Sequence, residues 1–154
     1  MKGMFGATLG VVMAIVAATG VATGKDKVSA VDLSAWVGDW SASVEQDIYI
    51  ALNETGGLHL EGFATWGAQD PDRAERGAVN FGEFSTHVPA DWVRADGWLE
   101  FAVRPDGPLP AQAAQDYDCV IALQLRGDEL VAEDNMMCGG HNVTFTGTYQ
   151  RMPD

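Results

Sequence analysis

The sequence predicts an all-β fold of about eight antiparallel strands, arranged as an up-and-down barrel or a sandwich and carrying one disulfide. Three observations support this fold class. Short runs alternate apolar and polar residues with a period of two. The segments between them are rich in Gly, Asp, Asn and Pro and are mostly of hairpin length, which favours antiparallel neighbours. The two Cys residues form an even pair, and no amphipathic helix of useful length interrupts the pattern.

The first 30 residues are predicted to be a secretory signal peptide. A positively charged start precedes an almost uncharged run over residues 4–19, and Val28-Ser29-Ala30 is a small-x-small cleavage site. Residues 31–154 then form a single barrel domain in the periplasm or the medium, with no membrane attachment after cleavage. Two Lys residues just before the cleavage site leave an uncleaved anchor as the alternative.

Eight runs of the mature chain carry the strand pattern. They cover residues 36–43, 47–52, 58–66, 78–88, 98–103, 117–125, 130–132 and 143–150. In the fourth run, Val79 and Phe81 are expected on one face and Asn80 and Gly82 on the other. Residues 67–77 are expected to form a charged loop. Residues 105–116 are too rich in Pro for a central strand.

Cys119 and Cys138 are predicted to form the disulfide, because an even number of Cys in an exported chain indicates a bridge. Cys119 lies in the sixth run, and Cys138 lies in the loop after the seventh. Closing a loop of this length contributes roughly 3 kcal/mol.

Two segments carry a resemblance to known proteins. The stretch Leu33–Trp40, with Gly38-x-Trp40 at its end, resembles the opening of calycin-type barrels of the lipocalin superfamily. The resemblance implies a short helical turn before the first strand, and a basic residue of the last strand packed over the Trp. Here Trp40 and Arg151 would be this barrel-closing pair. The tract 134–145 is similar to the carboxy-terminal region of small exported bacterial proteins of unknown function.

Charge restricts the partners. From Val31 onward the chain has 21 acidic residues and six Arg, a formal charge of −15. Such a surface repels nucleic acids and anionic lipids and attracts cationic proteins. The simpler interpretation is that the acidity only keeps the protein soluble.

No residues are assigned to catalysis, to a cofactor or to a metal. His59, His87 and His141 do not lie at a metal-ligand spacing. No Ser lies in a Gly-x-Ser-x-Gly elbow. Nothing selects a catalytic pair among the carboxylates, so a hydrolase with unrecognised carboxylates stays open as a second alternative.

The sequence therefore predicts an exported, non-enzymatic binding protein of inhibitor type, acting on a cationic secreted protein such as a cell-wall lytic enzyme. An exposed-looking Trp92 beside Asp91 and Asp96 is the expected anchor. The second expected contact is the charged loop, through Asp70, Asp72 and Glu75.

The first alternative function is a calycin-like barrel that holds a small apolar ligand. This alternative depends on small residues that would leave space inside the barrel. The candidates are Gly38, Gly62, Ala64 and Gly147.

Overall fold

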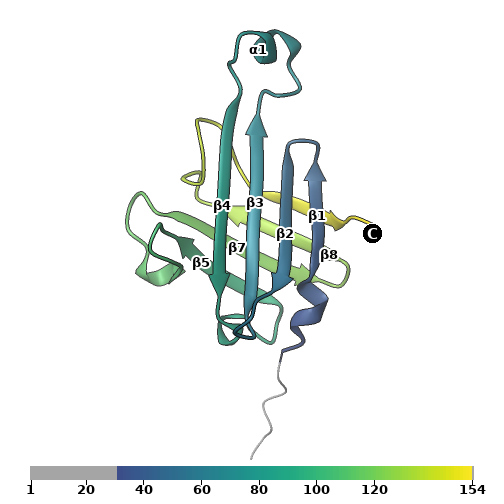
Figure 1. The fold of residues 1–154 in the computed structure, drawn as a ribbon, viewed down its shortest axis with the longest axis vertical. Helices are drawn as coiled ribbons and strands as arrows, with labels where there is room; N and C mark the ends of the chain where they lie inside the picture. The colour runs from purple at the N-terminus through teal and green to yellow at the C-terminus, as the bar shows by residue number, and fades with distance from the viewer. Residues whose placement is uncertain (1–30, 154) are drawn as a thin grey trace, which may run out of the picture.

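The computed structural model describes residues 31–153, which form an all-β protein (Figure 1). The predicted signal peptide lies outside these residues. The strands are β1 (Gly38–Ser43), β2 (Gln46–Leu52), β3 (Leu58–Trp66), β4 (Asn80–Val88), β5 (Trp98–Val103), β6 (Leu109–Pro110), β7 (Cys119–Arg126), β8 (Glu129–Asp134) and β9 (Gly147–Arg151). The helical elements are η1 (Leu33–Trp36), α1 (Pro71–Glu75), η2 (Ala90–Trp92) and η3 (Ala111–Ala113). In the described part of the chain, no helix has the length and apolar character needed to cross a membrane.

The strands form one antiparallel sheet in the order β4-β3-β2-β1-β9-β8-β7-β5-β6. The sheet curls into a half-barrel, and the β1–β9 pair joins its two parts. Without β6, this is the order of an eight-stranded up-and-down barrel that has opened between β4 and β5. The predicted all-β class and the disulfide are confirmed. The ninth strand, β6, comes from the Pro-rich loop and pairs only with β5, an edge position that tolerates Pro.

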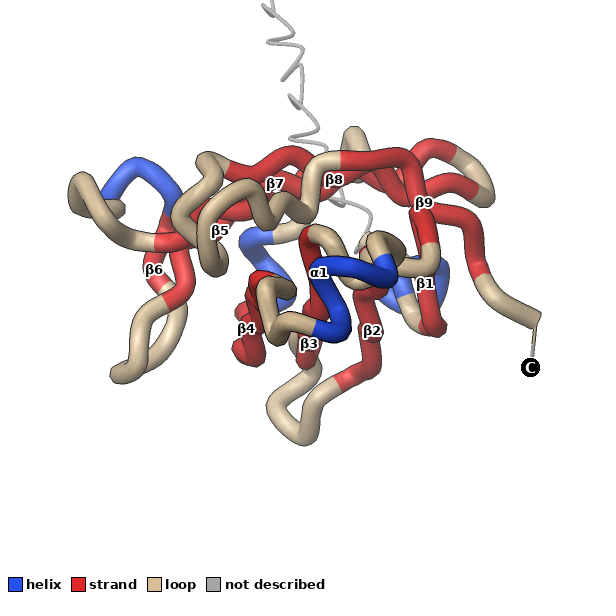
Figure 2. Tube along the Cα trace, turned by 90° about the horizontal axis from the view of Figure 1, so that it is seen from above, coloured by secondary structure: helices blue, strands red, loops and turns tan. Residues whose placement is uncertain are grey.

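The two parts of the sheet lie over one another. In Figure 1 the strands β1–β4 run side by side, while β5, β7 and β8 cross behind them, and Figure 2 shows the two layers from above. Their facing sides make the core, in which Phe84 of β4 packs edge-on against Phe145 and Phe101, with ring centroids at 5.0 and 6.1 Å. The largest fully buried side chains are Trp36, Trp40, Tyr149, Phe101, Phe145, Ile48, Ile50, Leu58, Leu60, Leu99, Ile121 and Leu123.

The small inward residues do not leave space inside. A Cβ on Gly62 would overlap the ring of Phe84, and one on Gly38 would overlap the guanidinium of Arg151. Around Gly147, the side chains of Ala42 and Tyr149 lie within 4 Å of such a Cβ. At these three glycines the expected space is therefore filled by neighbouring side chains.

One further expectation is corrected, and the faces expected for the fourth strand are confirmed. Phe81 and Gly82 lie on opposite faces: Phe81 points outward and is 59% exposed, whereas Gly82, Phe84 and Val88 are buried. The charged loop also contains a helical turn, α1, because the Asp70 carboxylate accepts hydrogen bonds from the N–H groups of Asp72 and Arg73, and Pro71 begins the helix.

The closed side of the half-barrel is the β1–β9 junction. Trp40 is buried, its Nε1 donates to the Trp36 carbonyl at 2.9 Å, and Arg151 lies opposite it in the pairing. The Arg151 guanidinium lies over the Trp40 ring at 4.1 Å and donates to the carbonyls of Val37 and Ala35. This side chain ties η1, β1 and β9 together.

The open side is covered in part by the loop between β8 and β9. The Cys119–Cys138 disulfide joins this loop to the start of β7, with the two Cα atoms 4.5 Å apart. Gly139 then forms a bridge with Gly82 of β4, and the Gly140 N–H donates to the Phe81 carbonyl at 2.8 Å. A Cβ on Gly82 would lie 2.8 Å from the Cys138 carbonyl oxygen, so glycine permits this close approach.

Candidate binding surface

The outer face of strands β1–β4, turned toward the reader in Figure 1, combines carboxylates with aromatic rings. Strand pairing places its residues in two rows. In the first row Tyr49 lies between Asp39 and Glu61. In the second row Phe63 lies between Asp47 and Glu83. We call these six residues the acidic aromatic face.

The side chains of this face are available to solvent. Tyr49 is 43% exposed and Phe63 is 48% exposed, although large rings on a strand normally face the core. Within residues 31–153, no hydrogen bond or ion pair reaches the carboxylates of Asp39, Asp47 or Glu83. Glu61 lies 3.2 Å from Nε2 of His59. The face therefore displays negative charge and aromatic surface that the fold itself leaves largely unused.

The geometry of each row suits a basic side chain. Neighbouring strands lie about 4.8 Å apart, so the two carboxylates of a row are about 10 Å apart with the ring between them. A Lys or Arg head group above that ring would gain a cation–π contact and two attractive carboxylates. The rows are two residues apart along each strand, which corresponds to about 6.8 Å.

An open groove runs from this face toward the loops on the open side. Its volume is about 1230 Å³, which is larger than the roughly 300–1,000 Å³ of typical small-molecule sites. The floor includes Asp47, Tyr49, Phe63 and Glu83, and the far wall includes Arg104, Pro105, Tyr117 and Met137. Tyr117 is 86% exposed and Met137 is 48% exposed, so the wall adds further unused apolar surface. The open shape and the charge suit a macromolecular segment better than an enclosed ligand.

Two of the three His residues lie together beside the face. His59 and His87 are opposite each other on β3 and β4, and their rings stack with centroids 4.3 Å apart. His141 lies in the β8–β9 loop, where its carbonyl accepts from Asn80 at 2.6 Å. Among the described residues, no group of three or more His, Cys, Asp or Glu side chains is arranged to hold a metal ion.

The residues expected from the sequence as the binding site are not brought together. Trp92 and Asp91 lie in η2 at one end of β4, while α1 lies beyond its other end (Figure 1). With nine residues, β4 separates the two by about 30 Å. Trp92 is half-buried against the core, and Asp96 pairs with Arg94 at 2.5 Å. Trp92 therefore has a packing role at this end of the half-barrel.

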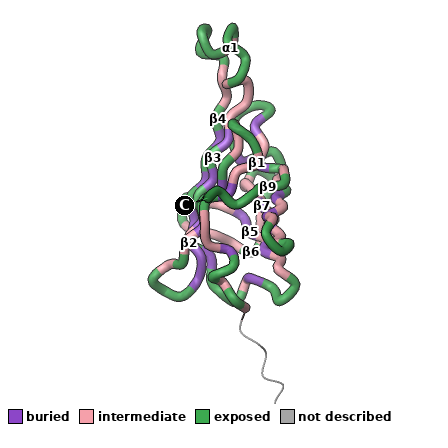
Figure 3. Tube along the Cα trace, turned by 90° about the vertical axis from the view of Figure 1, so that its right-hand side faces the viewer, coloured by how far each residue is buried: buried purple, intermediate pink, exposed green. Residues whose placement is uncertain are grey.

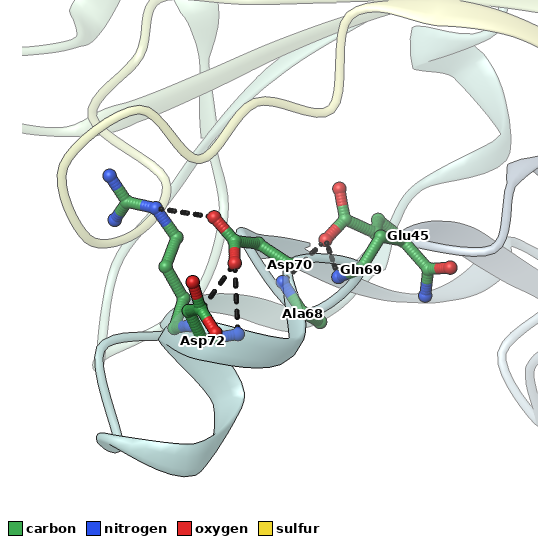
Figure 4. A network of polar contacts seen from close by, with 6 residues as sticks. Glu45, Ala68, Gln69, Asp70 and Asp72 are labelled. Carbon is green, nitrogen blue, oxygen red and sulfur yellow. Dashed lines mark hydrogen bonds and ion pairs between the residues drawn. The ribbon is translucent and has the colours of Figure 1, made fainter.

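At the other end, α1 is an exposed tip beyond the buried part of the molecule (Figure 3). Figure 4 shows how the tip is held: Oε1 of Glu45 accepts from the N–H groups of Ala68 and Gln69, at 2.7 and 3.3 Å. Asp70 caps the helix and lies 3.5 Å from Nε of Arg73. Its carboxylate is thus occupied within the fold, whereas Asp72 remains exposed.

The acidic aromatic face was not found from the sequence, although part of its pattern is visible there. Asp47 and Tyr49 alternate on one face of the second expected strand, and Glu61 and Phe63 on one face of the third. The rows appear only when the strand registers are known, because each row draws on three different strands.

Comparisons of the chain with protein-family models, with curated proteins and with solved structures find no match. The resemblance to calycin-type barrels therefore stays a prediction from the sequence. The acidic aromatic face and the adjoining groove are the features that bear on function.

Proposed function

We propose that this chain is an exported, non-enzymatic binding protein that takes a cationic secreted protein on the acidic aromatic face. The observation that carries the proposal is the pair of rows in which an exposed aromatic ring lies between two carboxylates. Basic side chains of the partner would lie over Tyr49 and Phe63. A cell-wall lytic enzyme with a basic surface is the partner class that this chemistry suits.

Charge and anchoring have separate roles in this proposal. The formal charge of −15 on residues 31–154 accelerates the approach of a cationic protein, and this contribution falls as salt rises. The aromatic rings contribute short-range contacts that salt weakens much less. A partner bound through the face should therefore show a salt-dependent association rate and a less salt-dependent dissociation rate.

The packed interior favours this function over the ligand-holding barrel. A ligand inside would have to displace Phe84 from the space above Gly62, and Phe84 contacts Phe101 and Phe145 in the core. The open groove is lined by outward residues such as Tyr49 and Phe63, and core residues such as Phe84 also border it.

The test uses two variants that remove the same charge. Asp47→Asn with Glu83→Gln acts on the face, and Asp72→Asn with Glu75→Gln acts on the exposed α1 tip. Each is measured by surface plasmon resonance against basic secreted enzymes, including lysozymes. We expect the face variant to lose about 2 kcal/mol of binding free energy, because it removes both carboxylates beside Phe63.

The α1 variant should lose only the small contribution of net charge to association. Phe63→Ala should weaken binding as the face variant does, and Trp92→Ala should not. Equal losses in the two charge-matched variants would show nonspecific attraction and would contradict the proposal.

A further inference from the structure

The open side of the half-barrel also has a free strand edge, that of β4. β4 is the last strand of the sheet, and all nine of its residues pair with β3 on one side. On the other side, only Gly82 forms a bridge within residues 31–153, with Gly139 of the β8–β9 loop. Exposed edges are normally blunted by Lys, Pro or a bulge. β4 contains no Lys or Pro, and its register with β3 is continuous.

The direction of the β4 backbone groups follows from this bridge. The Phe81 carbonyl accepts from Gly140, so the backbone of Phe81 points away from β3. Backbone direction alternates along a strand, so the N–H and C=O groups of Ser85 and His87 point the same way. No backbone hydrogen bond outside the strand pairing reaches either residue in the described chain. Two donors and two acceptors are therefore open to an added strand.

The groove lies along this same edge. Its lining includes Glu83 and Ser85 on β4, and Tyr117 and Met137 on the opposite wall. An extended segment placed there would have backbone partners on one side and exposed apolar side chains on the other. One outward side chain of the segment would lie beside Glu83. The next would lie beside Ser85 and point toward Glu61, which is opposite Ser85 in the β3–β4 pairing.

We propose that the free edge of β4 accepts an extended basic segment of the partner protein as an added antiparallel strand. The inference rests on the proposed binding of a cationic protein and specifies how that protein is held. Lys or Arg at alternate positions of the segment would meet Glu83 and Glu61, because alternate residues of a strand share a face. A second copy of this chain is a poorer occupant, because its charge of −15 would repel the first.

The probe is a synthetic peptide of alternating Val and Lys residues, used with the full purified protein. In the antiparallel arrangement, residues opposite Glu83 and Ser85 direct their N–H groups at β4. These are the Lys residues, while the Val N–H groups point away. Methylating the Lys backbone nitrogens should weaken binding about tenfold, through lost hydrogen bonds. The control peptide carries the methyl groups on the Val backbone nitrogens and has the same charge and size. Its affinity should differ from that of the unmethylated peptide by less than about twofold.

Two measurements on the protein complete the test. Peptide binding should slow hydrogen exchange of the Ser85 and His87 amides, and leave the Phe84 and Thr86 amides, which face β3, unchanged. Ser85→Pro removes an outward N–H that an edge strand can lose, and should weaken peptide binding about tenfold, whereas Ser85→Ala should not. If the Pro variant does not fold, the methylated peptides and the exchange pattern still decide the result.

The outcomes separate this inference from the proposed function. If Glu83→Gln weakens binding but backbone methylation and exchange show no alternation, the face binds cations and strand addition is wrong. If the Val–Lys peptide does not bind, strand addition is also wrong. The proposed binding of whole basic proteins is then tested separately, by the loss of affinity in the face variant. Protection of Ser85 that rises with protein concentration alone would make a second copy the occupant and overturn the proposal.

Discussion

The two sides of the half-barrel use their residues in opposite ways. On the closed side, Trp40 is buried, and the guanidinium of Arg151 contacts its ring and donates to two carbonyls. On the open side, β4 keeps a free edge, Phe63 meets the exposed ring of Phe81 with centroids 6.3 Å apart, and no hydrogen bond or ion pair reaches the Glu83 carboxylate within residues 31–153. On the closed side, an aromatic ring and a charged side chain thus hold elements of the fold together. The same kinds of residue are exposed to solvent on the open side, and this difference is the basis of the proposed binding function.

The inner and outer surfaces of β1–β4 should therefore differ most in their contribution to stability. Trp40→Ala should lower the free energy of unfolding by about 3–5 kcal/mol, because it removes a fully buried ring from the core. Phe63→Ala, on the outer face, should change it by less than about 1 kcal/mol. Urea denaturation measures both. Similar losses in the two variants would remove the distinction between a packed inner face and an unused outer face.

The disulfide should stabilise the open side specifically. Replacing Cys119 and Cys138 by Ala should cost roughly 3 kcal/mol, through the lost constraint on the unfolded chain. Native-state hydrogen exchange should also show faster opening at the Gly140 N–H, which bonds the loop to the Phe81 carbonyl. Exchange at the β1–β9 pair should change only as global stability does. A uniform change across the sheet would contradict a local role for the bridge.

Arg151 should matter less than Trp40. Arg151→Ala should cost about 1–2 kcal/mol, through lost packing over the ring and lost hydrogen bonds to Ala35 and Val37. Arg151→Lys keeps the charge but not the planar fork, so it should restore only part of this loss. Arg126→Ala, at the exposed β7–β8 turn, is the matched control and should be close to neutral in thermal denaturation. An Arg151 variant as stable as that control would remove its barrel-closing role.

The buried phenol of the closed side predicts an alkaline loss of stability. Burial, and then the nearby carboxylates of Asp134 and Asp47, raise the pKa of Tyr149 above its ordinary value of 10.0. Above pH 10 the unfolded chain loses a proton that the folded protein keeps, so stability should fall by up to about 1.4 kcal/mol per pH unit. Below pH 10, Tyr149 is protonated in both the folded and the unfolded chain, so it should not make the free energy of unfolding depend on pH.

Tyr149→Phe is the control for the alkaline effect. It should flatten the alkaline slope and cost about 1 kcal/mol at neutral pH, because the hydroxyl donates to the Phe145 carbonyl at 2.8 Å. An unchanged slope in this variant would assign the alkaline loss to other groups.

The sequence was most informative where one face of a strand is plainly apolar. In the third and fifth strands the apolar alternation is visible in the sequence, and its members Leu60 and Phe101 are buried; the even Cys count predicted the disulfide. The resemblance to calycin-type barrels implied an Arg151–Trp40 contact, and such a contact is present. In each case the information lies in the identity of a few residues and does not depend on the register between strands.

The fourth strand and the binding surface could not be predicted in that way. β4 has Phe on both faces, so a period of two cannot decide which side is buried. Gly62 decides it from another strand, because its missing side chain leaves the space that Phe84 fills. The acidic aromatic rows likewise depend on registers between strands. Trp92 is half-buried against a core that several strands build together, so its packing is not visible in its own segment of the sequence.

The central claim is that the open side and its outer face, rather than Trp92 or α1, make the contact with a cationic protein. The most direct test is an NMR footprint on the isotope-labelled protein as a basic partner is added to saturation. The account predicts that amide shifts change along β2, β3 and β4, centred on Phe63 and Glu83, with Trp92 and α1 unaffected. A footprint centred on Trp92 or on α1, or one spread evenly over all acidic loops, would contradict it.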